Sequence, residues 1–182
     1  MSKSRIDIIF GPMFAGKSSF LIKQIRLLKI LDKKYIVIKP KIDNRYSKTC
    51  VVSHDMVQEP CVSLDNLNNI FKQKLDEIDT IFIDEAQFFS DLVKNVLKLV
   101  EEKHINVFVV GLDGDSNRNK FGEILDLIPY SNTCQKIHSL CKICKDGTPG
   151  IFSKRICSDK KQNLIGAEDS YISVCRKHYL DS

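Results

Sequence analysis

The most informative residues of this chain form one short loop near the N-terminus. Gly11-Pro12-Met13-Phe14-Ala15-Gly16-Lys17-Ser18 fits the pattern G-x-x-x-x-G-K-S/T. In such a loop, successive backbone N–H groups and the N-terminus of the following helix bind phosphate oxygens. Lys17 would place its charge on the β- and γ-phosphates, and the Ser18 hydroxyl would bind Mg²⁺. The loop therefore predicts a site for a nucleoside triphosphate.

The residues on either side of the loop give it the required setting. The apolar run Ile6–Phe10 predicts a strand before it, and Leu21, Ile25, Leu28 and Leu31 predict one apolar face of a helix after it. A glycine turn that carries a lysine by chance is the alternative. Strand, glycine loop and helix in this order favour the phosphate-binding interpretation.

A second motif supplies acidic groups. The apolar run Thr80–Ile83 predicts a strand that ends in Asp84 and Glu85. In enzymes with this kind of phosphate loop, an Asp in that place helps to hold Mg²⁺, which we expect of Asp84. Glu85 could accept a proton from an attacking hydroxyl or water. Acidic residues that only cap a surface strand are the alternative.

Cysteine and histidine near the C-terminus have the spacing of metal ligands. Cys141 and Cys144 form a C-x₂-C pair, and Cys175 and His178 form a C-x₂-H pair. Together they predict a closed, structural Zn²⁺ site with three cysteines and one histidine. The alternative is a set of buried or free thiols with a surface histidine, and Cys157 is the one substitute ligand between the pairs.

Composition limits the classes of protein that fit. The chain has 182 residues, a net charge of +5 and seven cysteines. An odd number of cysteines without a secretion signal argues against a disulfide framework. No signal peptide and no apolar stretch long enough to cross a membrane is recognisable, so we expect a cytoplasmic protein. The chain has no block of like charges of the kind that marks a nucleic-acid-binding arm.

Strands and helices alternate over the first two-thirds of the chain, which predicts an α/β fold with a parallel sheet flanked by helices. The expected strands are Ile6–Phe10, Tyr35–Lys39, Thr80–Ile83 and Asn106–Val110. The expected helices are Ser18–Leu31, Asn66–Leu75, Asp91–Lys103 and Lys120–Leu127. The chain becomes rich in cysteines and turns after Pro129. We therefore expect two units, a nucleotide-binding domain over 1–135 and a small zinc-binding lobe over 136–182.

Six motifs in order resemble those of the thymidine kinases of the cellular-cytosolic, bacterial and poxviral type, over nearly the whole chain. GPMFAGKS resembles the phosphate loop of that family, and DEAQFF resembles its DEGQFF-type motif. The other four matches are Asp43-Asn44-Arg45-Tyr46, Ser53-His54-Asp55, Leu112-Asp113-Gly114 and Tyr171-Ile172-Ser173-Val174-Cys175-Arg176.

The resemblance implies transfer of a phosphoryl group from ATP to the 5′-hydroxyl of deoxythymidine, with deoxyuridine as a further substrate. Glu85 would be the general base, Lys17 would stabilise phosphate charge, and Arg45 would lie near the transferred phosphate. The nucleoside would contact the residues of a base pocket, with a lasso-like loop around 162–165 lying over the base. These residues are Met13, Phe88, Leu112, Phe121, Gln162, Leu164 and Tyr171.

The resemblance also implies a homotetramer and feedback inhibition by dTTP. Ser116 stands where family members often have an aromatic residue, which predicts a more open wall of the nucleoside pocket. Two other functions fit parts of the sequence. One is a phosphate-loop kinase for a different small acceptor, and the other is a nucleotide-switched zinc-ribbon module that binds nucleic acid. The lobe lacks the alternation of basic and aromatic residues that is typical of such a surface, so we expect no nucleic-acid partner.

Overall fold

A computed structural model describes residues 4–43, 49–52, 56–157 and 170–181. Within them, six strands form one parallel sheet in the order β5-β2-β6-β7-β1-β8. The strands are β1 (Ile6–Phe10), β2 (Tyr35–Pro40), β5 (Val62–Leu64), β6 (Thr80–Ile83), β7 (Asn106–Gly111) and β8 (Thr133–Lys136). The four predicted strands are all present, and the expected α/β class with a parallel sheet is confirmed. Because the strands are parallel, their carboxyl ends meet at one edge of the sheet.

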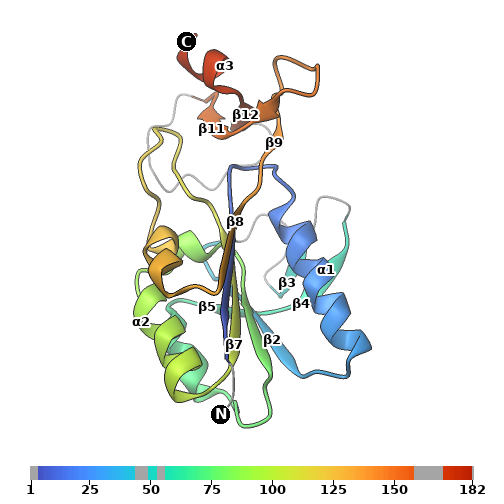
Figure 1. Cartoon of the computed structure of the whole chain (residues 1–182), viewed down its shortest axis with the longest axis vertical. Coiled ribbons are helices and arrows are strands. Elements are labelled where there is room, and N and C mark those ends of the chain that lie inside the picture. The colour runs from blue at the N-terminus through green and yellow to red at the C-terminus, as the bar shows by residue number, and fades with distance from the viewer. Residues whose placement is uncertain (1–3, 44–48, 53–55, 158–169, 182) are drawn as a thin grey trace.

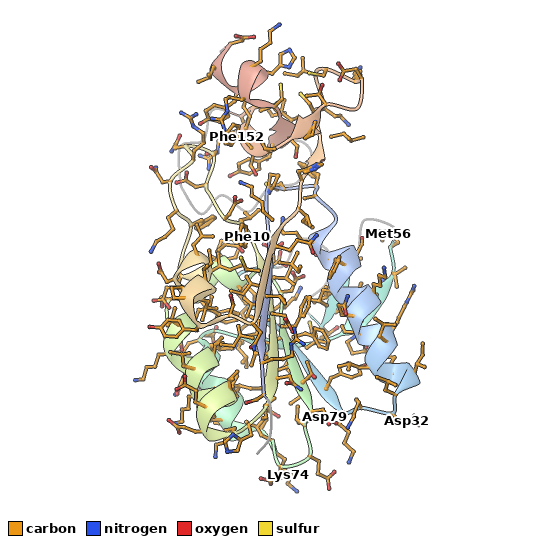
Figure 2. The ribbon with its side chains drawn as sticks, in the orientation of Figure 1. Phe10, Asp32, Met56, Lys74, Asp79 and Phe152 are labelled. Carbon is orange, nitrogen blue, oxygen red and sulfur yellow. The ribbon has the colours of Figure 1, made fainter. Side chains whose placement is uncertain are left out.

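Helices cover both faces of this sheet. Helix α1 (Lys17–Ile30) lies on one face, and α2 (Leu92–Leu97) lies on the other (Figure 1). Side chains fill both spaces between the sheet and the helices (Figure 2). Successive strand residues point to opposite faces, so Ile8 packs in the layer beneath α2 and Ile9 packs against α1. Two separate apolar layers thus hold the strand that leads into the phosphate loop.

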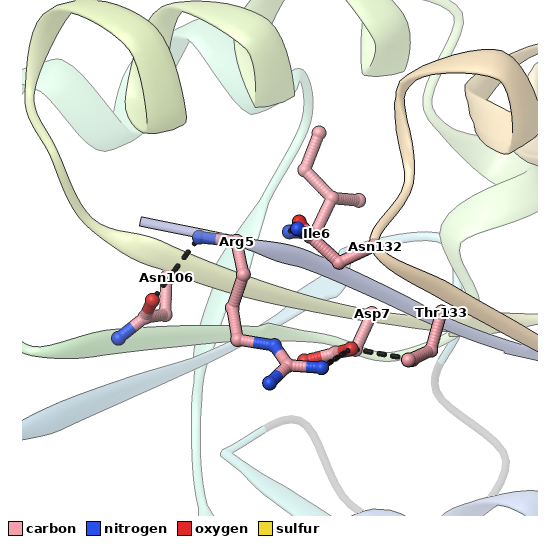
Figure 3. Close-up of polar contacts among 6 residues, drawn as sticks. All are labelled: Arg5, Ile6, Asp7, Asn106, Asn132 and Thr133. Atoms are coloured by element: carbon pink, nitrogen blue, oxygen red, sulfur yellow. Dashed lines mark hydrogen bonds and ion pairs between the residues drawn. The ribbon is translucent and has the colours of Figure 1, made fainter. Parts of the chain in front are cut away.

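The end of the sheet away from the phosphate loop is fixed by polar contacts (Figure 3). The backbone N–H of Ile6 donates to Oδ1 of Asn132 at 2.8 Å. The guanidinium of Arg5 donates to Asp7 at 2.7 Å, and Thr133 donates its hydroxyl to the same carboxylate oxygen. The bonds of Ile6 with Asn132 and of Asp7 with Thr133 join the start of β1 to the start of the edge strand β8.

The predicted helices are confirmed in part. The first begins at Lys17 and ends at Ile30, so Leu31 lies outside it and is exposed, while Ile22 takes a buried position. The expected helix over 66–75 is wrong in type, because only a 3₁₀-helix, η1 (Leu67–Lys72), forms there. The helix expected over 91–103 begins at Leu92, and its second half is the π-helix η3 (Lys98–Glu102).

The expected helix over 120–127 is also wrong in type. The structure has the 3₁₀-helix η4 (Ile124–Tyr130), which begins after Gly122 and contains Pro129. A glycine with a positive φ of 62° and a proline without an N–H both disfavour a regular α-helix. Another short 3₁₀-helix, η2 (Ala86–Phe88), follows the acidic pair after β6.

The C-terminal lobe consists of short elements. Strands β9 (Ser139–Leu140) and β10 (Pro149–Gly150) pair with each other, as do β11 (Phe152–Arg155) and β12 (Tyr171–Val174), and α3 (Arg176–Leu180) follows. A further antiparallel pair, β3 (Cys50–Val52) with β4 (Gln58–Pro60), lies beside α1. The lobe sits beyond the carboxyl edge of the sheet (Figure 1). The division of the chain into 1–135 and 136–182 stays a prediction.

None of the described helices is both long enough and apolar enough to span a lipid bilayer.

Candidate active site

A cavity of about 170 Å³ lies at the carboxyl edge of the parallel sheet. It forms where β1, β2, β6 and β7 end, the place where open α/β sheets bind ligands. The cavity brings together sequence-predicted residues that are far apart along the chain. Its lining includes Met13, Phe14, Ala15, Gly16, Lys17, Ser18, Asp84, Glu85 and Leu112.

The backbone of the phosphate loop needs its two glycines. Gly16 has a φ of 76° and immediately precedes α1, a conformation that costs glycine little. At Gly11, an added Cβ would lie 2.1 Å from the carbonyl oxygen of Ile137, so only glycine fits. That close approach places the chain segment leading into the C-terminal lobe directly over the start of the loop.

Lys17 and Ser18 open α1 and face the cavity. The ammonium of Lys17 donates to the carbonyl oxygen of Pro12 at 2.6 Å, and the residue is 8% exposed. This contact orients the ammonium, a group with three donors, at the edge of the cavity. The Ser18 hydroxyl donates to Oδ2 of Asp84 at 3.2 Å. The two oxygen ligands predicted for Mg²⁺ are therefore neighbours, and this hard-donor pair fits that ion.

Glu85 leaves β6 in an unusual backbone conformation. Its φ of 49° and ψ of 40° lie in the left-handed region, which is rare for residues other than glycine and recurs at functional sites. One carboxylate oxygen of Glu85 accepts a hydrogen bond from Nε2 of Gln87 at 2.6 Å. Oε1 of Gln87 in turn accepts from the backbone N–H of Leu112 at 2.9 Å. Gln87 therefore connects the acidic motif to the loop after β7.

Two glycines make room for Gln87. A Cβ at Gly111 would lie 2.5 Å from Oε1 of Gln87, and a Cβ at Gly122 would lie 2.2 Å from its carbonyl oxygen. Gln87 is itself 3% exposed. Gln87 was not predicted as a site residue, although its place between the apolar residues Ala86 and Phe88 was the available signal.

The cavity also contains an ion pair that was not predicted. Lys39, at the end of β2, lies 3.8 Å from Asp43, and the side chains of both are largely buried. Both residues line the cavity together with Lys17 and Asp84. The signal for Lys39 was its place as a charged residue at the end of β2, the strand beside β6, which is followed by the acidic pair.

The residues predicted to bind the nucleoside base are described only in part. Phe88 and Phe121 meet edge to face, with ring centroids 5.4 Å apart. Tyr171 is buried, and its hydroxyl accepts a hydrogen bond from Arg155 at 2.7 Å. Leu112 lines the cavity, whereas these three aromatic residues are not among its lining. Arg45, Gln162 and Leu164 lie outside the described residues, as do Asn44, Tyr46 and the Ser53–Asp55 motif.

The predicted zinc ligands form a tight cluster in the lobe. The side-chain ligand atoms of Cys141, Cys144, Cys175 and His178 all lie within 4.8 Å of one another. Nδ1 of His178 lies 3.6, 3.3 and 3.4 Å from the sulfurs of Cys141, Cys144 and Cys175, and two of the sulfurs are 3.8 Å apart. A tetrahedral Zn²⁺ with usual bond lengths requires about 3.8 Å between sulfurs and about 3.6 Å between sulfur and nitrogen. Cys157 is not part of the cluster.

Two cysteines of the cluster differ in how readily their thiols ionise. Burial opposes ionisation of Cys141, but the backbone N–H groups of Ile143, Cys144 and Cys175 and the His178 side chain lower its pKa to about 6. Burial and the neighbouring thiols raise the pKa of Cys144 to about 11. Adjacent thiolates repel one another, so the cluster can hold all of its thiols ionised only around a positive ion.

The parallel sheet, the phosphate loop at its carboxyl edge and the acidic pair at the end of β6 define a P-loop nucleotide-binding protein. Its C-terminal lobe carries a cluster suited to structural zinc.

Comparison with known proteins identifies the family. The family model described as Thymidine kinase matches residues 4–179. A thymidine kinase of Oryza sativa subsp. japonica is 41% identical over 97% of this chain and 66% of its own length. Thymidine kinase a of Arabidopsis thaliana is 38% identical over 96% of this chain and 74% of its own. The thymidine kinase of Variola virus is 39% identical over the full length of both chains.

The chain belongs to the thymidine kinase family, and it is therefore an ATP-dependent phosphotransferase.

Proposed function

We propose that this enzyme transfers the γ-phosphoryl group of ATP to the 5′-hydroxyl of deoxythymidine, and also to that of deoxyuridine, in the cytoplasm. One observation carries the proposal: a single cavity is lined by the phosphate loop, the acidic pair and Leu112 of the L-D-G motif. A phosphate bound by the loop would then lie in the same cavity as the proposed proton acceptor Glu85 and Leu112. Phosphoryl transfer depends mainly on such positioning and on charge stabilisation.

The donor side of the reaction involves the phosphate loop. Backbone N–H groups of the loop would bind the phosphates, and Lys17 would stabilise the charge that develops on the transferred group. Ser18 and Asp84 would hold Mg²⁺, which when bound neutralises charge between the β- and γ-phosphates. Arg45 is assigned to the same phosphate through the family pattern.

The acceptor side involves Glu85. We assign Glu85 to remove the proton of the 5′-hydroxyl as that oxygen attacks the γ-phosphorus, while the bond to the β-phosphate oxygen breaks and ADP leaves. The hydrogen bond from Gln87 fixes the orientation of the Glu85 carboxylate. A base held in one orientation loses little entropy on reaching the transition state.

Selection of the base is assigned to apolar contacts and to the backbone of the lasso. Phe88 would stack on thymine, Met13 would lie near the 5-methyl group, and Leu112, Phe121 and Tyr171 would complete the pocket with Gln162 and Leu164. A pocket fitted to thymine would exclude the larger purine bases. Because dTTP combines the same base with a triphosphate, it would compete for both halves of the site, which is the basis of the proposed feedback inhibition. We further propose a homotetramer.

The test is ATP-dependent phosphorylation of the four deoxynucleosides and uridine under identical conditions. Deoxyuridine, which lacks the 5-methyl group, is added to this panel. We expect phosphorylation of deoxythymidine and deoxyuridine, and none of deoxyadenosine or deoxyguanosine. Equal turnover of a purine deoxynucleoside would refute the pyrimidine pocket. ATP hydrolysis that needs no nucleoside would favour a different phosphate-loop enzyme. Light scattering of the same sample measures the oligomeric state.

A further inference from the structure

Two serines of the lobe hold the backbone of the phosphate loop. The N–H of Met13 donates to Oγ of Ser153 at 3.0 Å, and Oγ of Ser173 donates to the carbonyl oxygen of Met13 at 2.5 Å. Both backbone groups of Met13 are therefore bound by the lobe. Ser153 is 6% exposed and Ser173 is 3% exposed, so water competes little for either bond.

The two serines belong to one rigid unit. Ser153 lies on β11 and Ser173 on β12, and the two residues are directly paired across the antiparallel ladder. Side chains of directly paired residues point to the same face of a two-stranded sheet. The hairpin therefore presents two hydroxyls side by side, at a spacing that matches the N–H and C=O of one residue.

The same hairpin is tied to the metal-ligand cluster. The carbonyl oxygen of Ser173 accepts a hydrogen bond from the N–H of Lys142, which lies between Cys141 and Cys144. Ser173 also lies two residues before the predicted ligand Cys175, which directly follows β12. A short chain of bonds thus runs from the cluster through Ser173 to Met13.

We propose that Ser153 and Ser173 are positioning residues of the phosphate loop, and that the metal-ligand cluster determines the position of Met13 through them. This inference rests on the proposed function, in which the phosphate loop binds ATP and Met13 contacts the thymine. Because the N–H of Met13 is bound to Ser153, it does not contribute to the phosphate cradle, and the loop residues after Met13 supply the N–H donors. The serine pair thereby keeps the phosphate site and the nucleoside site in fixed relation.

The kinetic test compares Ser153→Ala, Ser173→Ala and the double variant with the wild-type holoenzyme. Misplacing reacting groups by about 1 Å can cost on the order of 100-fold in rate, so we expect kcat to fall about 10- to 100-fold. KM for ATP should change much less, because the other loop donors remain. Ser153→Thr retains the hydroxyl and should restore kcat. Ser139→Ala is the matched control in the same lobe, because within the described residues the Ser139 hydroxyl donates only to the adjacent Leu140 carbonyl.

A second readout requires no substrate. Exchange of the Met13 amide hydrogen, followed by NMR or mass spectrometry, should be about 3- to 10-fold faster in Ser153→Ala, the change expected from loss of one hydrogen bond of typical net strength. A strong chelator should accelerate the same exchange in the wild type and add little in the double variant. Zinc content and thermal melting of each variant are measured on the same samples.

The outcomes separate the two hypotheses. Unchanged Met13 exchange in the variants, or a loss of kcat that merely follows lost zinc or lost folding, would overturn the positioning role. Removal of the metal without effect on Met13 exchange would overturn its connection to the cluster. A wild-type protein with a protected Met13 amide but no activity on thymidine would instead refute the proposed function and leave the serine pair intact.

Discussion

Replacement of Gln87 by Glu tests the assignment of Glu85 as the base, because it changes the charge beside that carboxylate and little else. In the wild type, Nε2 of Gln87 donates to Glu85 at 2.6 Å, and Oε1 accepts from the N–H of Leu112 at 2.9 Å. A glutamate at this position has the same shape and can still accept from Leu112. It places a second carboxylate oxygen where the N–H donor was.

The magnitude follows from this geometry. Two unit charges about 3 Å apart repel by about 1.4 kcal/mol in bulk water and about 5.5 kcal/mol at an effective dielectric constant of about 20. Each 1.36 kcal/mol corresponds to about one pH unit in a titration. Repulsion favours the protonated form of Glu85 and so raises its pKa. As the pH is lowered, Glu85 in the variant therefore becomes protonated, and stops acting as a base, at a higher pH than in the wild type. We expect the acid limb of the pH–rate profile to move upward by about one to three units, because Glu85 is half-buried.

The assay is kcat for thymidine phosphorylation from mildly acidic to mildly alkaline pH, with activity recovering toward the wild-type value at the alkaline end. Gln87→Met is the control, since it removes both hydrogen bonds without adding charge. It leaves the Leu112 N–H without this acceptor, which should cost about 1–3 kcal/mol of stability and lower kcat. Loss of the Nε2 donor to the Glu85 carboxylate should also move the limb upward, but by less than the added charge of Gln87→Glu does. A Gln87→Glu profile that coincides with the wild-type profile would refute the assignment, as would an equal shift in Gln87→Met.

Three further predictions address the remaining groups of the site. Glu85→Gln keeps the shape of the side chain but not its basicity, so turnover should fall about 10²- to 10⁴-fold while thymidine still binds in calorimetry; near-normal turnover would show that Glu85 is not the base. Lys17→Ala should reduce kcat strongly with little change in thermal melting, because the ammonium contacts the loop and the cavity; a collapsed melting transition would make Lys17 structural. Cys175→Ser should lower both zinc content and thymidine affinity while α1 stays folded, and zinc affinity should fall at acid pH, because protons compete for the ligands; full activity of a zinc-free protein would contradict this.

The sequence was sufficient where function depends on local patterns. The four central strands are mostly apolar runs, so their positions were predicted within a residue or two. The residues of the phosphate loop, and those of each ligand pair, lie close together in the sequence, so their spacing can be recognised without a structure. The residue types in these motifs are dictated by the chemistry of phosphate and metal, which leaves few alternatives.

The sequence was insufficient where a contact joins distant segments. Met13 and Ser153 are 140 positions apart, and Met13 and Ser173 are 160 apart, so no local pattern predicts their bonds. The mistaken helices have a different cause. The apolar spacing over 120–127 resembles a helix, but Gly122 packs against the backbone of Gln87 and Pro129 lies within the segment, so tertiary contacts and backbone chemistry outweigh the pattern.

The lobe is small, and its stability depends on what it contacts. Its buried apolar cluster consists of Cys141, Val174 and Cys175, of which two are predicted metal ligands. So few buried groups cannot hold a fold against chain entropy without a metal or a partner surface. The sheet domain provides that surface at a second place, because Tyr179 donates its hydroxyl to the carbonyl oxygen of Ser116 at 2.8 Å and Arg118 lies 4.5 Å over its ring.

These two attachments have a common consequence for catalysis. One is to Met13 in the phosphate loop, and the other is to the loop that follows Leu112, so the lobe contacts both sides of the proposed nucleoside site. An element that was needed only to cover the base would require neither hydrogen bond to Met13. The folded lobe instead determines the distance between the phosphate loop and the proposed nucleoside wall, because it is hydrogen-bonded to both. Loss of the metal should therefore reduce catalysis before it unfolds the parallel sheet.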